Sequence, residues 1–562
     1  MDKNDALYKA FLNELETLEH FRVTYAGERP TVPLGREDPD VQRLIESLAV
    51  FSARTRLTAE RSVRRSALQL FRQHFPYLLN PLPATAMLQA ISSSRHVDAV
   101  AIPKGSEVRV SVVPSSAPVA AATRTTDPSA AADTTLSFRT QRQLRILPMS
   151  LVGVDMFRQS NKQYRLVLTI EAAFFRNDSV GELNLYVNHL NDLQSSLAIF
   201  YQLKQHITHA SVVFDQEVDE QTRGEPVRFY FGAPREVSSA AESFEHPLQQ
   251  ARAFFRFPQQ ALYLNVHIEK QPRNWESFSL CFDIDPAWPL QLRPNPDTFV
   301  LHTVPMINVR RDFADPIEHD GTRDRYPIRH PEADGGHVLH SVRGLYKITG
   351  TELAPLRPGI MGDEPDSYEL EWTGAGDKRR GYAAFVMPSA FEQPVRVAVD
   401  AYWHQPGLYD EDSLVSAVRL AERHVDGLDF ELSGGYVSAV DGPMQDSQPG
   451  LLHLLSIKNQ RFLERDDVVF LLQAMGVLQE RVFAELAYRL TATSVSSKPF
   501  AKKAQGFKYI YHLQFGTLDG SSLPVLDLFC TKLLDVLIAW SNEEVVELSV
   551  SVPNLEAQLH YS

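Results

Sequence analysis

The chain has 562 residues and a mass of 63.4 kDa, more than a single hydrophobic core accommodates, so we expect three or four domains. The net charge of −14 argues against nucleic acid as the main partner, because phosphate binding requires a concentrated basic surface. The two cysteines, Cys281 and Cys530, exclude a disulfide scaffold or a cysteine-rich zinc module and indicate a reducing compartment.

The N-terminal stretch is acidic and amphipathic, and it lacks the basic segment and continuous apolar run of a signal peptide. No window of the sequence approaches the roughly 20 apolar residues that span a bilayer. We therefore expect a cytoplasmic protein without direct membrane insertion.

Residues 1–80 are predicted to be helical. Asp38 can cap a helix, and Pro39 suits the first helical position. Apolar residues recur at steps of three and four on both sides of this start signal, as on one face of a helix. This apolar stripe comprises Leu7, Phe11, Leu15, Leu18, Val41, Leu44, Leu48 and Phe51.

Residues 54–72 carry six arginines and a single acid, Glu60. This pattern indicates either a solvated helix face or a basic patch that meets an acidic neighbour. The helical pattern then ends in "FPYLLNPLP" at 75–83, which contains Pro76, Pro81 and Pro83. Proline removes a backbone donor and disfavours helix at the preceding residue, so the helix must end there in a rigid, apolar segment.

The remainder predicts a multidomain α+β protein. Residues 81–285 alternate in the manner of strands, with a mobile, Ala/Ser/Thr/Pro-rich loop at 114–135 and short helices at 190–206 and around 246–256. Residues 286–440 form a second, mainly β region, which opens with a long connection spanning 284–336. Residues 441–562 form a C-terminal α+β domain with helices at about 466–490 and at 522–541.

Signatures of catalysis are missing from the sequence. It contains no phosphate-binding glycine loop, nucleophile elbow, His-Glu-x-x-His motif or EF-hand loop. A polar segment at 310–340 holds His319, Asp320, His330, His337 and His340. Zinc favours histidine and carboxylate ligands, so a metal-dependent hydrolase is an alternative. Because these residues follow no signature spacing, we interpret the segment as a surface connection and expect no catalytic, cofactor or metal site.

Several segments together indicate a family. In chain order they are "NELETL" (13–18), "EDPDVQRLIESLAVFSAR" (37–54), "FPYLLNPLPA" (75–84), "IPKGSEV", "LSFRTQRQLRILPMSL", "FFRFPQQALYLNV" and "HTVPMINVRRDFADPIEHDGTRDRYPI". They resemble the TssF family, baseplate subunits of bacterial type VI secretion systems, over nearly the whole chain. One departure is Ser137, where the family often has a cysteine before Phe-Arg-Thr.

The resemblance implies a structural subunit without catalytic activity. TssF-like subunits pair around one TssG subunit to form a baseplate wedge, similar to the wedges of contractile phage tails. Wedges surround the VgrG spike, receive TssK, which docks to the inner-membrane complex, and support the sheath through TssE. The apolar stripe would then join a helical bundle with a TssG-like subunit and a second copy of this chain, and the three prolines would form a joint that directs the β-rich regions outward.

Two alternatives accompany this interpretation. In the first, the stripe residues close a core within the chain, since apolar periodicity does not distinguish a core from an interface. In the second, the machine is a phage tail or an extracellular contractile injection particle, whose wedge proteins are similar.

Overall fold

The computed structural model describes residues 3–28, 39–113, 134–160, 162–235, 246–332, 335–359, 365–374, 376–391, 393–406, 414–442, 444, 448–458, 460–499, 507–541, 545–554 and 558–561. The chain divides into two compact units. The first comprises Met1–Pro76 and Asp446–Ser456, and the second comprises Tyr77–Gln445 and Ile457–Ser562. Among the described residues, no helix combines the length and the apolar character needed to cross a membrane.

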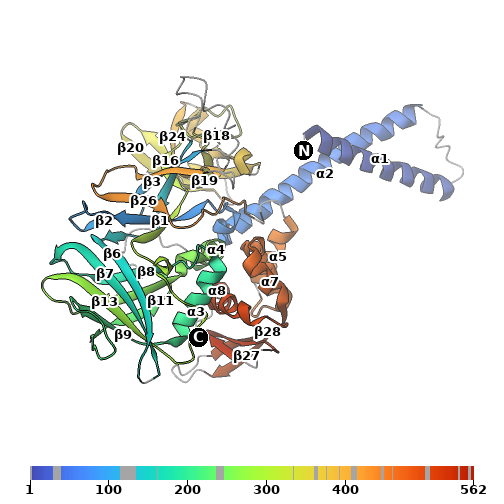
Figure 1. Cartoon of the computed structure of the whole chain (residues 1–562). Coiled ribbons are helices and arrows are strands. Elements are labelled where there is room, and N and C mark those ends of the chain that lie inside the picture. Colours follow the sequence, from blue (N-terminus) through green and yellow to red (C-terminus); the bar gives the residue numbers. More distant parts are fainter. Residues whose placement is uncertain are drawn as a thin grey trace, which may run out of the picture. The chain divides into compact units, whose positions relative to one another are not determined.

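The first unit is built on a helical hairpin of α1 (Lys3–Glu28) and α2 (Pro39–His74), as Figure 1 shows. The start of α2 at Pro39 confirms the predicted start signal, although Asp38 lies outside the described residues. Helix α2 continues through the arginine-rich stretch as one helix of 36 residues. It ends at His74, directly before the proline-rich segment, as predicted. The helix α5 (Gln448–Lys458) starts in this unit and ends in the second.

The second unit contains a six-stranded barrel with the strand order β1-β15-β4-β3-β25-β26. Its strands are β1 (Thr85–Ser92), β3 (Glu107–Val113), β4 (Thr134–Thr140), β15 (Thr303–Ile307), β25 (Leu414–Leu420) and β26 (Leu428–Leu432). Inward-facing aliphatic and aromatic residues from all six strands form its core. The barrel therefore unites strands that are more than 300 residues apart in the sequence. A short pair, β2 (Val100–Ile102) with β5 (Leu144–Ile146), accompanies it.

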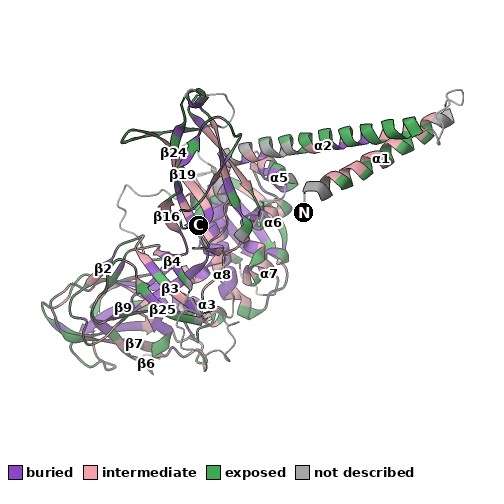
Figure 2. Cartoon of the chain, turned by 90° about the horizontal axis from the view of Figure 1, so that it is seen from above, coloured by how far each residue is buried: buried purple, intermediate pink, exposed green. Residues whose placement is uncertain are grey.

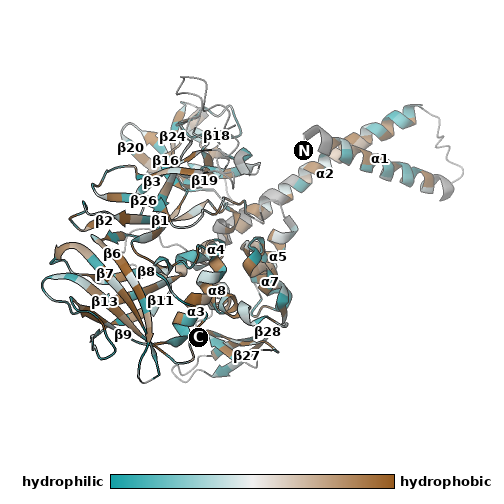
Figure 3. Cartoon of the chain, viewed as in Figure 1, coloured by the Kyte–Doolittle hydropathy of each residue, from teal (hydrophilic) through white to brown (hydrophobic). Residues whose placement is uncertain are grey.

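Two further sheets are formed by residues that lie between the barrel strands β4 and β15 in the sequence. The first has the order β10-β9-β13-β7-β6, with β6 (Met149–Arg158), β7 (Tyr164–Arg176), β9 (Ile207–Phe214), β10 (Glu225–Pro226) and β13 (Trp275–Ile284). The second has the order β11-β12-β8-β14, with β8 (Gly181–Val187), β11 (Arg228–Phe231), β12 (Tyr263–Ile268) and β14 (Phe299–Val300). Apolar residues gather along β6, β7 and β13 (Figure 3). Cys281 is buried in β13, where burial raises the pKa of its thiol to about 11, so it packs as a small core residue.

A second β region is formed by two more sheets that share one apolar core. One sheet contains β16 (Arg310–Phe313), β17 (Ile317–His319), β19 (Val338–Thr349), β20 (Glu352–Pro355) and β24 (Val395–His404). The other contains β18 (Tyr326–Ile328), β21 (Arg357–Pro358), β22 (Ser367–Thr373) and β23 (Arg380–Val386).

The C-terminal part combines helices with the sheet β27-β28-β29-β30. Its strands are β27 (Leu490–Pro499), β28 (Phe507–Phe515), β29 (Val546–Ser551) and β30 (Gln558–Tyr561). The parallel strands β28 and β29 are joined through α8 (Leu523–Ser541), which has an apolar, largely buried surface. Phe529 of α8 packs with Phe483 and with Phe255, which belongs to α4 (Pro247–Arg256). The helix α3 (Leu193–His206) joins α8 through an ion pair between Lys204 and Asp527.

Two sequence predictions are wrong in detail. The stretch 284–336, predicted as a long connection, contains five short strands from β14 to β18, and their two to five residues each are too few to show a period. The helix predicted at 466–490 is broken into α6 (Arg465–Ala474) and α7 (Arg481–Arg489). Gly476 lies between them with a φ of 85°, which ends the first helix because this left-handed conformation suits glycine. The predicted loop at 114–135 lies outside the described residues except for Thr134 and Thr135, which open β4.

Candidate subunit interface

The helical hairpin is held together by small residues and one polar cluster. Ala49 and Ala53 of α2 are fully buried, and such small side chains allow two helices to approach closely. Glu14 of α1 accepts hydrogen bonds from Ser52 at 2.7 Å and from Arg56 at 3.1 Å, both of which lie on α2. The bonds from Ser52 and then Arg56 hold the pKa of the Glu14 carboxyl below its ordinary value. The polar cluster therefore fixes how the two helices face each other.

The predicted stripe residues fall into two groups. Leu7, Phe11, Leu15, Leu18 and Val41 are half-buried. The four on α1 share a helix face with Glu14, whose contacts show that this face points toward α2. Leu44, Leu48 and Phe51 are instead exposed, by 62%, 49% and 70%. We call these three residues the outer stripe (Figure 2 shows the exposed residues along α2).

The outer stripe has the composition of a contact surface. Its members lie at steps of four and three along α2, so they share one helix face. Large exposed apolar side chains in a contiguous row typically mark a protein–protein interface. The sequence pattern did not reveal Ala49 and Ala53 as the centre of the hairpin, because alanine is common on any helix face. Their spacing of four residues, in phase with Ile45 and Ser52, is the signal that points to them.

The arginine-rich stretch of α2 is partly described. Arg54 is exposed, and Arg56 bonds to Glu14 and to Glu60 at 3.1 Å each. The side chains of Arg61, Arg64, Arg65 and Arg72 lie outside the described residues. The predicted basic patch therefore stays a prediction.

The proline-rich segment coincides with the division between the two units, which falls between Pro76 and Tyr77. Pro76 opens a short 3-10 helix, η1 (Pro76–Leu79), and Pro81 and Pro83 are buried in the second unit. From Leu82 onward the backbone pairs with the segment around Val440.

Two side chains hold the backbone of this segment within the second unit. Arg252 donates to the carbonyl of Asn80 at 2.7 Å, and Nε2 of His340 lies 3.2 Å from the carbonyl of Pro81. Arg252 is buried, and burial together with the nearby charge of Arg379 lowers its pKa to about 9. The segment after Tyr77 is thus anchored to the second unit by directional bonds.

The structure separates the polar residues of 310–340 into several places. His319 packs edge-on against Tyr326, and Asp320 accepts hydrogen bonds from Thr322 and Tyr326. His340 belongs to the anchor described above. Only His330 and His337 come together, with ring centroids 4.1 Å apart, and Glu332 lies beside them.

The group of His330, Glu332 and His337 has the residue types of a zinc site, but its hydrogen bonds oppose one. Nδ1 of His330 accepts from the backbone N–H of Glu332 at 3.0 Å, which places the ring proton on Nε2, 3.7 Å from the Asp312 carboxylate. The guanidinium of Arg310 lies 3.2 Å from the Glu332 carboxylate, in the place of a cation. Burial and the neighbouring ring lower the pKa of His337 to about 4, so the histidines are neutral at pH 7. Nε2 of His330 and Nδ1 of His337 are buried without a hydrogen-bond partner among the described residues, so the polar cluster is only partly satisfied.

Two solved structures share this architecture. The chain is similar to one in the type VI secretion system TssK-TssF-TssG baseplate subcomplex solved by cryo-electron microscopy, with a TM-score of 0.73 at 15% identity over 93% of this chain and 98% of that one. It is also similar to a chain in the baseplate complex from the type VI secretion system, with a TM-score of 0.59 at 15% identity over 99% of this chain and 98% of that one. The chain therefore shares its fold with a chain of each of these two complexes.

The particular family follows from the sequence itself. The family model described as "Type VI secretion system, TssF" matches residues 11–380, about two thirds of the chain. The chain belongs to the TssF family. Among curated proteins, none matches significantly.

Proposed function

We propose that this chain is a structural subunit of a type VI secretion baseplate. It forms a wedge with one TssG-like subunit and a second copy of itself, and the wedges assemble around the spike hub and support the sheath. The family match and the shared fold support this proposal. The solved subcomplex contains TssK and TssG beside TssF, which supports the same two partners for this chain. Contacts with TssE and the VgrG spike, and a cytoplasmic location beside the inner membrane, follow from the family alone.

The observation that carries the proposal is the outer stripe of Leu44, Leu48 and Phe51. These side chains expose apolar area on a helix whose neighbouring face already packs within the hairpin. A third helix laid against the outer stripe would remove that area from water and extend the hairpin into a bundle. We propose this as the contact with the TssG-like subunit or the second copy. The half-buried residues Leu7, Phe11, Leu15, Leu18 and Val41 would then stabilise the hairpin that presents it.

Native mass spectrometry of this chain co-expressed with the TssG-like protein encoded next to it tests the proposal. The expected species holds two copies of this chain and one of its neighbour. A monomer beside an unbound neighbour, in a sample whose fold is intact by circular dichroism, would contradict the wedge. Neighbouring genes also separate the machines, because a phage tail or an extracellular injection particle lacks the TssK-like and membrane-complex genes.

The prolines are proposed to act as a joint between the two units. The support is that the division of the chain falls directly after Pro76, while the residues that follow are anchored by Arg252 and His340. Proline stiffens the chain on either side of this point and reduces the entropy lost when the assembly orders it.

We also propose that the chain acts without catalysing a reaction. The support is the structural role of the family and the hydrogen bonding of the His330, Glu332 and His337 group. Metal analysis of the purified protein tests this point. Stoichiometric zinc or manganese that is lost in His337→Ala would favour the metal-dependent hydrolase instead.

A further inference from the structure

The barrel is closed at one seam by a single residue pair. Strand β25 pairs with β3 along its whole length, from Leu414 opposite Val113 to Leu420 opposite Val108. On its other side, only Val418 pairs with β26, opposite Phe430. The outer edge of β25 from Leu414 to Ala417 has no strand partner in the described part of the chain.

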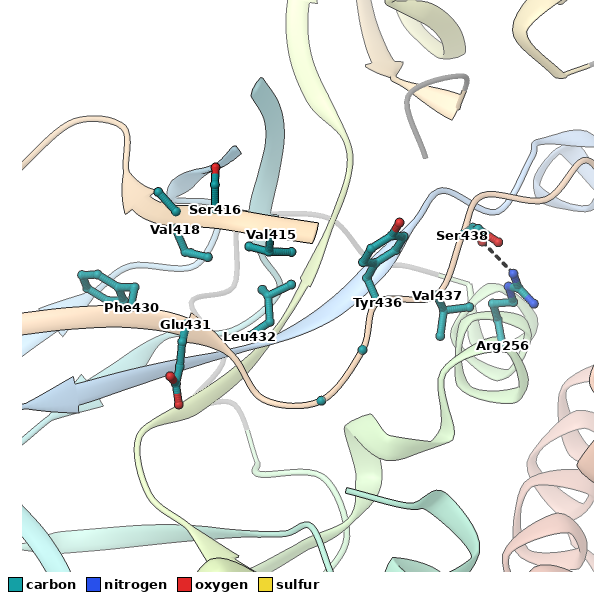
Figure 4. Close-up of a pocket in the computed structure, with 13 residues that line it drawn as sticks. Arg256, Val415, Ser416, Val418, Phe430, Glu431, Leu432, Tyr436, Val437 and Ser438 are labelled. Atoms are coloured by element: carbon teal, nitrogen blue, oxygen red, sulfur yellow. Dashed lines mark hydrogen bonds between the residues drawn. The ribbon is translucent and has the colours of Figure 1, made fainter. Parts of the chain in front are cut away.

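On the facing side, only Phe430 of β26 pairs with β25 in the described part of the chain. Strand β26 and the residues after it use one side to pair with β1, through Leu432 opposite Leu88 and through hydrogen bonds from Ser433 and Val437 to the β1 backbone. Their other side faces β25 across a cavity of about 790 Å³. We call this space, between Leu414–Ala417 and Phe430–Ser438, the strand slot (Figure 4).

The strand slot opens onto the core of the barrel. Phe430, Leu432 and Tyr436 line it and pack against the core, but all three are only half-buried. Val415 on the opposite edge is 37% exposed. In a barrel with another strand at this seam, such side chains would be covered. The apolar lining and the two strand edges without partners among the described residues therefore both indicate room for one more strand between β25 and β26.

The rim of the strand slot contains two charged residues and two glycines. Arg256 donates to the carbonyl of Ser438 at 2.6 Å and pairs with Glu480, so it fixes one end of the rim and is not available to a ligand (Figure 4). Glu431 is exposed and forms no ion pair with another described residue. Gly434 and Gly435 leave open space, because a Cβ added at either would meet no atom within 4 Å.

We propose that the strand slot binds an extended peptide segment of another protein chain as an additional β-strand. Backbone groups of the segment bond to the free edges of β25 and β26, alternate apolar side chains cover Phe430 and Leu432, and a basic side chain lies beside Glu431. Strand addition of this kind takes its affinity from main-chain hydrogen bonds and its specificity from the alternate side chains.

The chemistry of the edges favours this occupant over a small molecule. Unpaired strand edges are normally protected by charged residues or proline, because they otherwise recruit another strand. The stretch Leu414–Val418 contains neither. A bulge at Ser416 bends the edge, and the Ser416 hydroxyl turns back to donate to the carbonyl of Ser111. The edge thus keeps its backbone groups available while the side chain points to the neighbouring strand.

Fluorescence anisotropy of the full chain with a labelled seven-residue peptide of alternating lysine and valine tests the proposal. We expect saturable binding that weakens at least about tenfold when alternate peptide nitrogens are methylated, because methylation removes hydrogen bonds worth about 1 kcal/mol each. Replacing the peptide lysines by glutamates should abolish binding through repulsion from Glu431. Hydrogen exchange should show new protection of those amides of Val415–Ala417 that point away from β3 when the peptide is bound.

Matched variants locate the site. Gly435→Trp fills the slot and should abolish binding, whereas Gly520→Trp, at another glycine with open space around it, should leave binding unchanged. Glu431→Gln should weaken the lysine peptide severalfold. The proposal is overturned by absence of binding, by equal affinity for the methylated peptide, or by an equal loss in both tryptophan variants. Protection in the free chain of those Val415–Ala417 amides that point away from β3 would overturn it as well, because the outer edge would then be paired within the protein.

Discussion

Replacement of Phe51 by serine separates an interface residue from a core residue. Phe51 is 70% exposed in the single chain, the largest exposed fraction among the three residues of the outer stripe. Phenylalanine and serine have similar helix propensities, so the substitution leaves the intrinsic stability of α2 nearly unchanged. We therefore expect the free energy of unfolding of the isolated chain to change by no more than about 0.5 kcal/mol.

The effect on assembly should be much larger. A phenylalanine side chain buries about 200 Å² when fully covered, so the 70% that is still exposed corresponds to about 140 Å². At about 25 cal/mol per Å², covering this area contributes about 3.5 kcal/mol, which is an upper value because ordering and imperfect packing reduce it. The dissociation constant of the complex with the TssG-like subunit should therefore rise between about tenfold and three-hundredfold in Phe51→Ser.

The assay is a titration of the purified chain with the TssG-like subunit, followed by analytical ultracentrifugation and by urea unfolding of the chain alone. Val50→Ser is the matched control. Val50 is also exposed, by 41%, and also changes to serine at similar propensity, but it lies about 120° around the helix from the outer stripe. Equal weakening by both substitutions, or a drop in the unfolding midpoint of Phe51→Ser that matches its loss of affinity, would refute the reasoning.

Three further predictions concern the stability of the chain. Ala53→Leu should destabilise the hairpin by about 1–3 kcal/mol, because Ala53 is fully buried and a larger side chain separates α1 from α2. Hydrogen exchange of the two helices measures this loss of stability. The control substitution Val50→Leu, at an exposed position, should have no effect. Arg252→Ala should lower the free energy of unfolding in urea by about 2–3 kcal/mol, since it leaves the Asn80 carbonyl without its 2.7 Å donor and empties buried space. An unchanged free energy of unfolding would show that this anchor is dispensable. Burial lowers the pKa of His302 to about 4, and its Nε2 accepts from the backbone N–H of Leu147 at 3.2 Å, so the folded chain holds this ring neutral. The unfolded chain protonates it below its ordinary pKa of about 6.5, so the stability due to His302 is fully present above that pH and falls as the pH drops toward 4, by about 2 kcal/mol at pH 5. The decrease in stability from pH 7.5 to pH 5 should be smaller by that amount in His302→Gln, and an identical decrease would show that His302 is not responsible.

The sequence predicts local elements better than it predicts their partners. Helix α2 starts at Pro39 because capping and first-turn preferences are local, and strands such as β3 alternate visibly. The periodicity does not predict the break between α6 and α7, because that break depends on the left-handed backbone of a single residue, Gly476. The short strands between 299 and 328 contain too few residues for any period.

The candidate interface was predictable only as a set of apolar positions. Periodicity places Leu15 of α1 and Phe51 of α2 in one stripe, but which of them faces the other helix depends on how the two helices pack, and that depends on Ala49 and Ala53. The strand slot is invisible in the sequence for the same reason. Strands β25 and β26 pair with β3 and β1, whose residues lie more than 300 positions away, and a missing neighbour leaves no local pattern.

The length of α2 makes the position of Pro76 mechanically significant. A helix of 36 residues is about 54 Å long, so each degree of rotation at its C-terminal end moves the opposite end by about 1 Å. The outer stripe lies near that opposite end, within 13 residues of Pro39. If the chain meets its partners through the outer stripe as proposed, a few degrees of rotation at the base of α2 would carry Phe51 past the side chains of its partner. Stiffness at 75–83, the proposed joint, would then set how accurately the subunits of the assembly meet.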